Sequence, residues 1–288
     1  MRHSVSGSVI QQPVNLITGK ERMGAFLEVQ GLRKEFAEHG NLVAIESITF
    51  SVERGDFVSI VGPSGCGKTT LMRCVGGLSR PTNGKIMLKD REVTGPPEGV
   101  VVVFQDYSKS LLPWRSVLGN VTLGLESMGE LSSQQRVDRA RQYLEAVSVS
   151  GFERFYPRQI SGGMQQRVAI ARALAFRPEV LLMDEPFASV DAQTRSELED
   201  VVLRIWKEYE QTVLFVTHDI EEAIYLATKV VVIGARPSRV IDTFSVELGP
   251  DRDQLTTRES RHFLDLRHRV YRAIRTAREP SSITQPAQ

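Results

Sequence analysis

The nonapeptide GPSGCGKTT, running from Gly62 to Thr70, constrains the fold of this chain more than any other feature. It matches the pattern G-x-x-x-x-G-K followed by Ser or Thr, and it lies between the β-branched run FVSIV and a helix-forming stretch. Glycines let the backbone N–H groups of such a loop turn inward around an anion, and the following helix presents unpaired N-terminal amides to it. The pattern therefore predicts a strand, a phosphate-binding loop and a helix in an α/β fold.

The polar residues of this loop predict its ligands. Lys68 supplies a compact charge for the β and γ phosphates of a nucleotide, and the Thr69 hydroxyl is a ligand for Mg²⁺. A glycine-rich turn with an incidental lysine would leave the flanking strand and helix unexplained. ATP and Mg²⁺ are the expected cofactors. The loop residues predicted to contact the nucleotide are Gly62, Pro63, Ser64, Gly65, Cys66, Gly67, Lys68, Thr69 and Thr70.

Four polar residues follow the apolar runs of three predicted strands. Asp184 and Glu185 follow VLLM, Gln105 follows VVVVF, and His218 comes just after TVLFV. Ligands of open parallel sheets bind at the carboxyl ends of the strands. Asp184 is predicted to hold Mg²⁺, and Glu185 to polarise the water that attacks the γ-phosphate. A single glutamine or histidine at a strand end is usually structural, but four polar residues beside one phosphate loop favour a catalytic site.

A second glycine-rich segment, ISGGMQQ at Ile160 to Gln166, lacks a lysine. Ser161 is placed to cap a helix, and the two glycines permit close backbone approach to an anion. A helix terminus contributes only about 0.3 to 2 kcal/mol toward an anion, which is too little to hold a nucleotide alone. By itself, the segment is more consistent with an ordinary capped helix.

The rest of the chain alternates strand and helix patterns. Strands are expected at 26–32, 43–52, 57–61, 85–89, 100–104, 180–184, 212–216, 229–234 and 239–248. Helices are expected at 69–75, 116–125, 132–147, 161–176, 191–209, 220–227 and 255–276. Since no strand pattern occurs between Gln105 and Ser161, a helical insertion is expected at about 106–176. We predict a flexible tail at 1–24, an α/β ATPase domain at 25–250 with a mainly parallel sheet, and a basic helix and tail at 251–288.

Composition limits the compartment and the partners. The 36 basic and 35 acidic residues give a net charge of +1, which provides no reason to expect a nucleic-acid partner. Cys66 and Cys74 are too few for a disulfide framework, which indicates a reducing, cytosolic compartment. We see no secretory signal, and no apolar run reaches the roughly 18 to 20 residues that span a bilayer. Any role at a membrane therefore requires another protein to hold this one there.

The motifs together resemble an ABC transporter ATP-binding subunit. Phe36, the Gly62 to Thr70 loop, Gln105, ISGGMQQ, VLLMDE, ASVD and His218 occur in the order and spacing of that family, over about residues 26–234. The stretches FQDYSKSLLPWRSVLGNV and RHFLDLRHRVYRAI resemble importer ATPases of the nitrate, sulfonate and taurine type. The implied fold is an ABC-type P-loop NTPase with an N-terminal antiparallel β portion.

The resemblance implies a role for each matching residue. Gln105 would sense Mg²⁺ and the attacking water, His218 would contact the γ-phosphate, and Phe36 would stack on adenine. Asp191 matches the acid of a loop that crosses between subunits. The implied nucleotide contacts of the second glycine-rich segment are Ser161, Gly162, Gly163 and Gln165. One copy of each motif per chain implies a homodimer in which each ATP is bound between the loop of one subunit and the signature segment of the other.

The sequence departs from the family pattern in three places, which together comprise five residues. Ile160 stands where Leu is common, which preserves the apolar character. The crossing loop reads Ala188, Ser189, Val190 where Ser or Gly, Ala and Leu are commoner, so its subunit contacts are less defined. Phe36 has no hydroxyl group, although stacking requires only the ring.

Two surfaces are candidates for contacts outside the ATP site. Leu111, Leu112 and Trp114 are predicted to contact a transmembrane permease subunit, or alternatively to pack inside the helical insertion. The C-terminal helix carries an apolar stripe, predicted to pack on the protein beneath a solvated basic face, with a membrane-surface contact as the alternative. The stripe consists of Phe263, Leu266, Val270 and Ile274.

The resemblance implies the ATP-hydrolysing subunit of an ABC importer, peripheral on the cytoplasmic face of the inner membrane. Permease subunits, and indirectly a solute-binding protein, would be its partners, and the substrate would be nitrate-, sulfonate- or taurine-like. The main alternative is a non-transport ABC ATPase that remodels nucleic acid or ribosomes, which usually has a second ATPase unit or a long coiled coil. A P-loop kinase or GTPase leaves ISGGMQQ unexplained, and a non-hydrolysing regulatory binder stays open.

Overall fold

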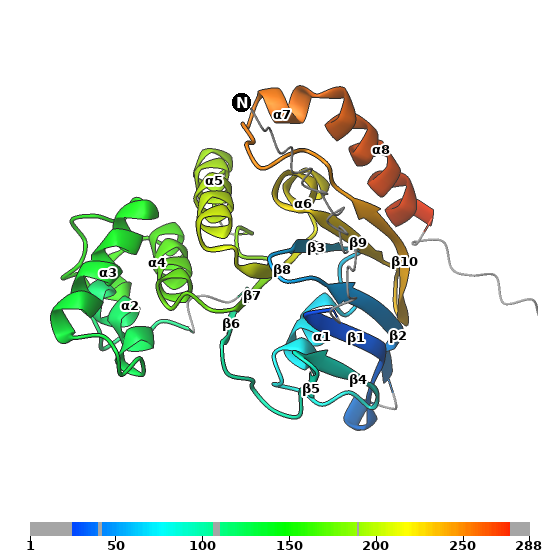
Figure 1. Ribbon diagram of the computed structural model, residues 1–288, viewed down its shortest axis with the longest axis horizontal. Helices are drawn as coiled ribbons and strands as arrows, with labels where there is room; N and C mark the ends of the chain where they lie inside the picture. Colours follow the sequence, from blue (N-terminus) through cyan, green and yellow to red (C-terminus); the bar gives the residue numbers. More distant parts are fainter. Residues whose placement is uncertain (1–24, 40–41, 106–109, 189, 277–288) are drawn as a thin grey trace, which may run out of the picture.

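The computed structural model describes residues 25–39, 42–105, 110–188 and 190–276. The tail predicted at 1–24 and the end of the chain at 277–288 lie outside this part. The described chain forms a central sheet with a layer of helices at one end and two further helices along the opposite end (Figure 1).

Ten strands form one sheet in the order β5-β4-β1-β2-β10-β9-β3-β8-β7-β6. The strands are β1 (Leu27–Phe36), β2 (Leu42–Val52), β3 (Phe57–Val61), β4 (Asn83–Leu88), β5 (Arg91–Glu92), β6 (Val100–Val103), β7 (Val180–Asp184), β8 (Thr212–Thr217), β9 (Lys229–Ile233) and β10 (Ser238–Ser245). Strands β6, β7, β8, β3 and β9 pair in parallel, whereas β2, β1, β4 and β5 pair antiparallel. The predicted fold class is confirmed.

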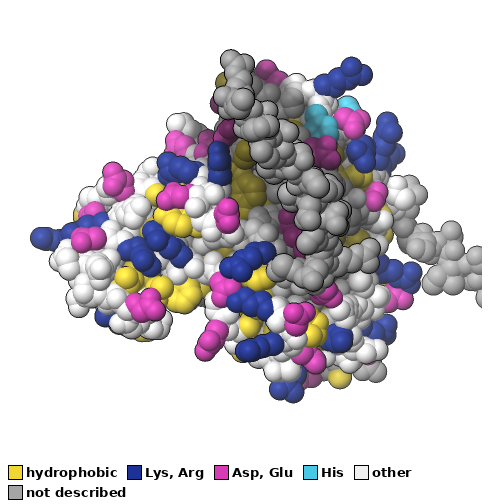
Figure 2. Space-filling view, viewed as in Figure 1, with side chains coloured by type: hydrophobic (Ala, Val, Ile, Leu, Met, Phe, Trp, Pro, Cys, Tyr) yellow, Lys and Arg dark blue, Asp and Glu magenta, His cyan; other side chains and the backbone are white. Residues whose placement is uncertain are grey.

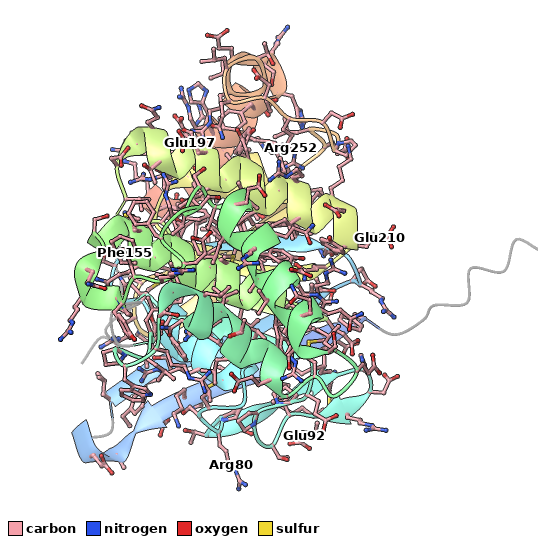
Figure 3. The ribbon with its side chains drawn as sticks, turned by 90° about the vertical axis from the view of Figure 1, so that its left-hand side faces the viewer. Arg80, Glu92, Phe155, Glu197, Glu210 and Arg252 are labelled. Atoms are coloured by element: carbon pink, nitrogen blue, oxygen red, sulfur yellow. The ribbon has the colours of Figure 1, made fainter. Side chains whose placement is uncertain are left out.

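Eight α-helices are described: α1 (Lys68–Val75), α2 (Val117–Glu126), α3 (Ser133–Ala146), α4 (Gly162–Ala175), α5 (Ala192–Tyr209), α6 (Ile220–Leu226), α7 (Thr256–Glu259) and α8 (Arg261–Thr276). In the described chain between β6 and β7 there are helices and loops but no strand, as the sequence predicts. Helices α2 and α3 stand in front of the sheet when the molecule is turned by 90° (Figure 3).

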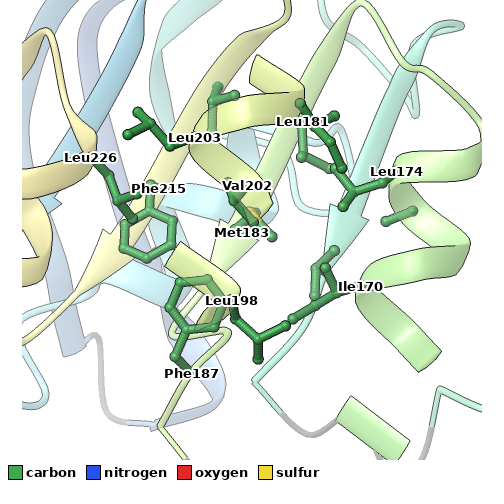
Figure 4. Close-up of a cluster of buried hydrophobic side chains, with 14 of the residues drawn as sticks. Ile170, Leu174, Leu181, Met183, Phe187, Leu198, Val202, Leu203, Phe215 and Leu226 are labelled. Atoms are coloured by element: carbon green, nitrogen blue, oxygen red, sulfur yellow. The ribbon is translucent and has the colours of Figure 1, made fainter. Parts of the chain in front are cut away.

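Both faces of the parallel strands are covered, and this explains their continuous apolar runs. Every residue of β3, β7 and β8 is buried. Side chains alternate between two hydrophobic cores: Leu181 and Met183 of β7 belong to one, and Val180 and Leu182 to the other. The first core joins α4, β7 and α5 into one packed unit (Figure 4). This core thereby fixes the helical layer to β7, the strand whose carboxyl end carries Asp184 of the predicted site.

The structure corrects the prediction of one long C-terminal helix at 255–276. Ser260 is extended, with φ −62° and ψ 142°, and it separates α7 from α8. Its side chain accepts a hydrogen bond from Phe263 N at 3.2 Å, so this serine starts a new helix. The predicted apolar stripe of α8 is buried and packed in the first core, as expected.

Several strand boundaries also differ from the prediction, and β10 ends at Ser245 where 248 is expected. Strand β1 continues to Phe36, beyond Leu32, because a bulge near Gly31, with φ +55°, lets the chain keep pairing. Strand β4 ends at Leu88, because Lys89 and Asp90 adopt positive φ and turn the chain into the short β5. At the surface, basic and acidic side chains are interspersed over the described part of the face in Figure 2.

Candidate active site

The glycine loop connects β3 to α1 and is shaped by two kinds of constraint. Gly65 and Gly67 have φ values of +75° and +100°, where a side chain would be strained. Gly62 is needed for a different reason, since a Cβ atom there would lie 2.6 Å from the carbonyl oxygen of Ile233 in β9. Helix α1 begins after Gly67 with no side-chain cap. Its first amides are therefore free of side-chain partners at the position where a phosphate would bind.

Lys68 lies inside the curve of this loop. Its side chain is only 5 % exposed, and Nζ donates to the carbonyl oxygens of Gly62 at 2.9 Å and Pro63 at 3.1 Å. The same Nζ lies 3.9 Å from Oε1 of Glu185. The loop thus holds its one lysine beside the predicted catalytic carboxylate.

The side chain of Glu185, which follows β7, contacts residues that follow two other strands. Its Oε2 accepts a hydrogen bond from Gln105 Nε2 at 3.3 Å and lies 3.1 Å from His218 Nδ1. Gln105 follows β6, Glu185 follows β7 and His218 follows β8, so the parallel register of these strands brings the three residues together. Glu185 has φ +46°, an uncommon conformation for a side chain larger than glycine, of the kind that concentrates at functional sites. Its backbone N–H donates to Val216 O at 2.8 Å.

Asp184 is suited to hold a magnesium ion. It is 2 % exposed, and burial raises the pKa of its carboxyl group, opposed by a hydrogen bond with Thr69. Its Oδ1 is buried and has no hydrogen-bond partner. A buried carboxylate oxygen with spare capacity beside a threonine hydroxyl is a donor set that Mg²⁺ prefers. Among the described residues no three His, Cys, Asp or Glu side chains form a metal cluster.

The second glycine-rich segment lies apart from the first. Ser161 caps α4 by accepting from Met164 N at 3.2 Å, and Ser161 and Gly162 are exposed. No hydrogen bond or ion pair between described residues joins this segment to the glycine loop. The Gln165 Nε2 atom donates to the carbonyls of Pro157 at 2.9 Å and Ile160 at 3.3 Å. This amide therefore shapes the turn in front of α4.

Two residues assigned from the resemblance have local structural contacts. Asp191 caps α5, with Oδ1 accepting from Thr194 N at 3.0 Å, and these hydrogen bonds lower the pKa of its carboxyl group. Phe36 ends β1, with the Lys34 ammonium 5.2 Å from the centre of its ring. Ser189 of the predicted crossing loop lies outside the described residues.

A family model for the ABC transporter matches residues 45–188. An ABC transporter ATP-binding protein of Methanocaldococcus jannaschii is 47 % identical over 257 residues, covering 89 % of this chain and 94 % of the relative. The chain belongs to the ABC transporter family. It is an ABC transporter ATPase, and the predicted family is confirmed.

Other relatives of this ABC transporter ATPase are named as importer components. The nitrate import ATP-binding protein NrtD of Synechocystis is 43 % identical and covers 79 % of this chain and 85 % of its own length. An aliphatic sulfonates import ATP-binding protein SsuB of Bacillus cereus is 39 % identical, covering 85 % and 94 %. The solved dimeric structure of the bacterial cassette MJ0796 matches with a TM-score of 0.70 at 29 % identity, covering 77 % and 99 %.

The loop predicted to contact a permease is only partly exposed in this ABC transporter ATPase. Trp114 is 72 % exposed, whereas Leu111 is 3 % exposed and packs in the first core. The prediction that Leu111 supplies a contact is therefore wrong, because its side chain is needed inside the helical layer. Leu112 is partly buried. Beside this loop, β6, α2 and α4 enclose a hollow of about 370 Å³.

Sequence reasoning missed Asn120, which shapes this loop. Asn120 is fully buried in α2; its Oδ1 accepts from Leu112 N at 2.8 Å, and Nδ2 donates to the carbonyls of Leu112, Arg115 and Ser116. Burying an amide is favourable only when its hydrogen bonds are satisfied, and here they hold the turn that exposes Trp114. A lone asparagine in the apolar pattern VLGNV was the available signal.

Proposed function

We propose that this protein is the ATP-hydrolysing subunit of an ABC importer and works as a homodimer. The observation that carries the proposal is the meeting of Gln105 and His218 on Oε2 of Glu185, whose other oxygen, Oε1, lies 3.9 Å from Lys68 Nζ. A carboxylate held between a charged phosphate ligand, an amide and an imidazole is arranged to orient a water and take its proton. The relatedness to import ATP-binding proteins supports the direction of transport.

Each part of the site has its own share of the chemistry. The loop from Gly62 to Thr70 binds the phosphates through backbone amides and the Lys68 ammonium. Thr69, Asp184 and Gln105 are the residues that would hold Mg²⁺, and a bound ion would neutralise the charge that develops on the phosphates. Glu185 orients the attacking water and accepts its proton, while His218 donates a hydrogen bond toward the γ-phosphate. Phe36 stacks on the adenine ring.

We propose that a second copy completes each site. The exposed start of α4 offers amides and a helix dipole through Ser161, Gly162 and Gly163, and nothing in the described chain brings them to the chain's own glycine loop. Those amides are therefore available to a nucleotide held by the partner subunit, with Gln165 fixing the turn before them. Asp191, at the start of α5, faces the partner. The similar cassette MJ0796 forms a dimer in its solved structure, which supports this arrangement.

Coupling to transport requires a contact with permease subunits at the cytoplasmic face of the inner membrane. Among described residues, no helix combines the length and apolar character needed to cross a bilayer. We assign the contact to the hollow beside α2 and α4 and to Trp114, with Leu112 at its side; Trp is a frequent interface anchor. The substrate is proposed to be a nitrate-, sulfonate- or taurine-like solute, delivered through a solute-binding protein. The same proposal includes the domain organisation: a tail at 1–24, an ATPase domain at 25–250 with a helical insertion at about 106–176, and a C-terminal segment at 251–288.

Two variants test the proposal. Lys68→Ala should lose nucleotide binding, because it removes the charge that neutralises the phosphates. Glu185→Gln should bind ATP, stop hydrolysing it and accumulate as a closed dimer, because the glutamine cannot take the proton of water. Nucleotide binding, phosphate release and the ATP-dependent change in mass in solution measure these outcomes. Wild-type hydrolysis by Glu185→Gln would show that the assignment of the base is wrong.

A further inference from the structure

Helices α5 and α6 begin close together, and Arg195 joins their first turns. Arg195 lies one turn after Asp191, with its backbone N–H donating to Asp191 O at 2.9 Å. Its guanidinium NH1 donates to Oδ2 of Asp219 at 3.4 Å. Asp219 directly follows His218 in the chain. The side chain therefore connects the start of α5 to the residue next to the catalytic histidine.

Asp219 is fixed on the other side by its own helix. Its Oδ1 accepts from the backbone N–H groups of Glu221 at 2.9 Å and Glu222 at 3.2 Å, and its own N–H donates to Thr217 Oγ1 at 3.0 Å. These bonds bracket His218 on both sides. Asp219 is thus the one residue that contacts Arg195 in these bonds and also adjoins His218 in the chain.

Arg195 also borders the catalytic pair directly. Glu185, Phe187, Arg195, His218 and Glu222 line a crevice of about 10 Å³, which is about the room of one water molecule. The Nε atom of Arg195 is buried and has no hydrogen-bond partner. A buried guanidinium N–H without a partner is costly for stability alone, so this geometry favours a role at the site over a purely structural one.

We propose that Arg195 is a positioning residue that holds His218 against Glu185 through Asp219 and ties this pair to Asp191. The proposal rests on the proposed function, since it assumes that His218 acts in ATP hydrolysis and that Asp191 faces the partner subunit. A contact of the partner subunit with Asp191 is then transmitted to His218 through the first turn of α5 and the ion pair between Arg195 and Asp219.

The test uses the full-length protein and compares Arg195→Ala with Asp219→Asn. Asparagine still caps α6 but cannot pair with the guanidinium, so both variants break the same link without removing the cap. We expect kcat for ATP to fall about tenfold in each, a coupling typical of contacting charged groups, with KM changed less than about twofold. In a His218→Ala background, Arg195→Ala should cause no further loss. The matched control is Arg204→Ala, an exposed arginine on the same helix, which should keep the wild-type kcat.

A second readout separates positioning from folding. In the Glu185→Gln background, Arg195→Ala should still form the ATP-dependent dimer at the wild-type nucleotide concentration. Loss of dimerisation together with kcat, or a kcat equal to wild type, would overturn the positioning role while leaving the proposed function intact. Failure of the wild-type protein to hydrolyse ATP would instead overturn both proposals.

Discussion

At the scale of single residues, the candidate site contains two positions with an unusual backbone constraint, Glu185 and Gly62. Glu185 adopts φ +46° at the end of β7, and a hydrogen bond from its N–H to Val216 O keeps it there. At Gly62 the constraint is the close approach of β9, which leaves no room for a Cβ atom, and not the φ angle. The strain and the close approach both lie beside the predicted γ-phosphate, where strained residues often serve function.

Gly62→Ala tests the close approach. The added methyl group would lie 2.6 Å from Ile233 O and 2.8 Å from Ile233 Cγ1, so the loop must move away from β9. We expect a loss of about 1 to 3 kcal/mol in the free energy of unfolding, together with weaker ATP binding. Gly95→Ala is the control, because nothing lies within 4 Å of a Cβ atom there. Equal urea midpoints for the two variants would contradict this expectation.

At the scale of secondary-structure elements, several residues of the proposed site lie at the N-termini of helices. Ser161 caps α4 and Ser132 caps α3 in the same way, with Ser132 also paired to Gln135 in a capping box. Helices α5 and α6 begin with the capping aspartates Asp191 and Asp219, and Asp219 directly follows His218. The same capping chemistry is thus present in α3 and α4, and our proposal adds ligand binding at α4 alone.

The two capping serines provide a matched comparison. Ser161→Ala and Ser132→Ala should each lower the free energy of unfolding by about 1 kcal/mol, because each leaves one N-terminal amide unpaired. Only Ser161→Ala should also reduce ATP hydrolysis and the ATP-dependent dimer of the Glu185→Gln variant. Chemical denaturation and phosphate release measure the two effects. A similar loss of hydrolysis in Ser132→Ala would show that capping stability alone accounts for the result.

Glu222 at the start of α6 makes stability depend on pH. Burial raises its pKa from 4.5 to about 8; a hydrogen bond with Thr217 opposes this shift. Glu199 and Asp219 add to it through their negative charge, and Arg195 opposes it. Between these two pH values the folded protein keeps a proton that the unfolded chain releases. The stabilisation present below pH 4.5 is therefore lost as the pH rises toward 8.

The measurement is the free energy of unfolding from about pH 5 to about pH 8. Glu222 alone contributes a decrease of at most about 1.4 kcal/mol per pH unit in that window. Glu222→Gln cannot ionise, and its stability should fall less steeply with pH than that of the wild type. Glu145→Gln, at an exposed position on α3, should keep the wild-type slope. Parallel pH profiles for wild type and Glu222→Gln would contradict the assignment.

At the scale of the whole molecule, one core continues from the helical layer to α8. Phe263 is fully buried, and the first core contains it together with residues of α4, β7 and α5. The basic side chains of α8 meet carboxylates and rings on neighbouring elements: Arg267 donates to Glu221 at 2.9 Å, and Arg269 lies 5.1 Å from the ring centre of Phe244. The described part of the predicted C-terminal segment is thus packed on the ATPase core.

Phe263→Ala should therefore destabilise the entire protein. We expect a loss of about 3 to 5 kcal/mol, because the substitution removes a buried ring and leaves a cavity. Tyr271→Ala on the same helix is the control; its side chain is 57 % exposed, and a change within about 0.5 kcal/mol is expected. Urea unfolding followed by circular dichroism measures both. A separate early transition of α8 in the wild type would show that this helix folds independently of the core.

Signals carried by neighbouring residues were sufficient to predict most of the fold and the centre of the site. The apolar runs ending in Gln105, Glu185 and His218 predicted three strands, and the parallel sheet made their carboxyl ends coincide. The glycine loop and the cap at Ser161 are local too, since their dihedral preferences and hydrogen bonds involve residues a few positions apart. These features could be predicted because their physical causes lie within a short stretch of chain.

Other features were decided only by tertiary structure. Leu111 and Trp114 have the same apolar character in the sequence, yet one is buried and the other exposed, because packing against α2 and α4 selects between them. Arg195 reaches Asp219 across 24 positions, and Asp184 has a buried unpaired oxygen because surrounding elements exclude water. Such contacts join distant residues, and local propensity does not encode them.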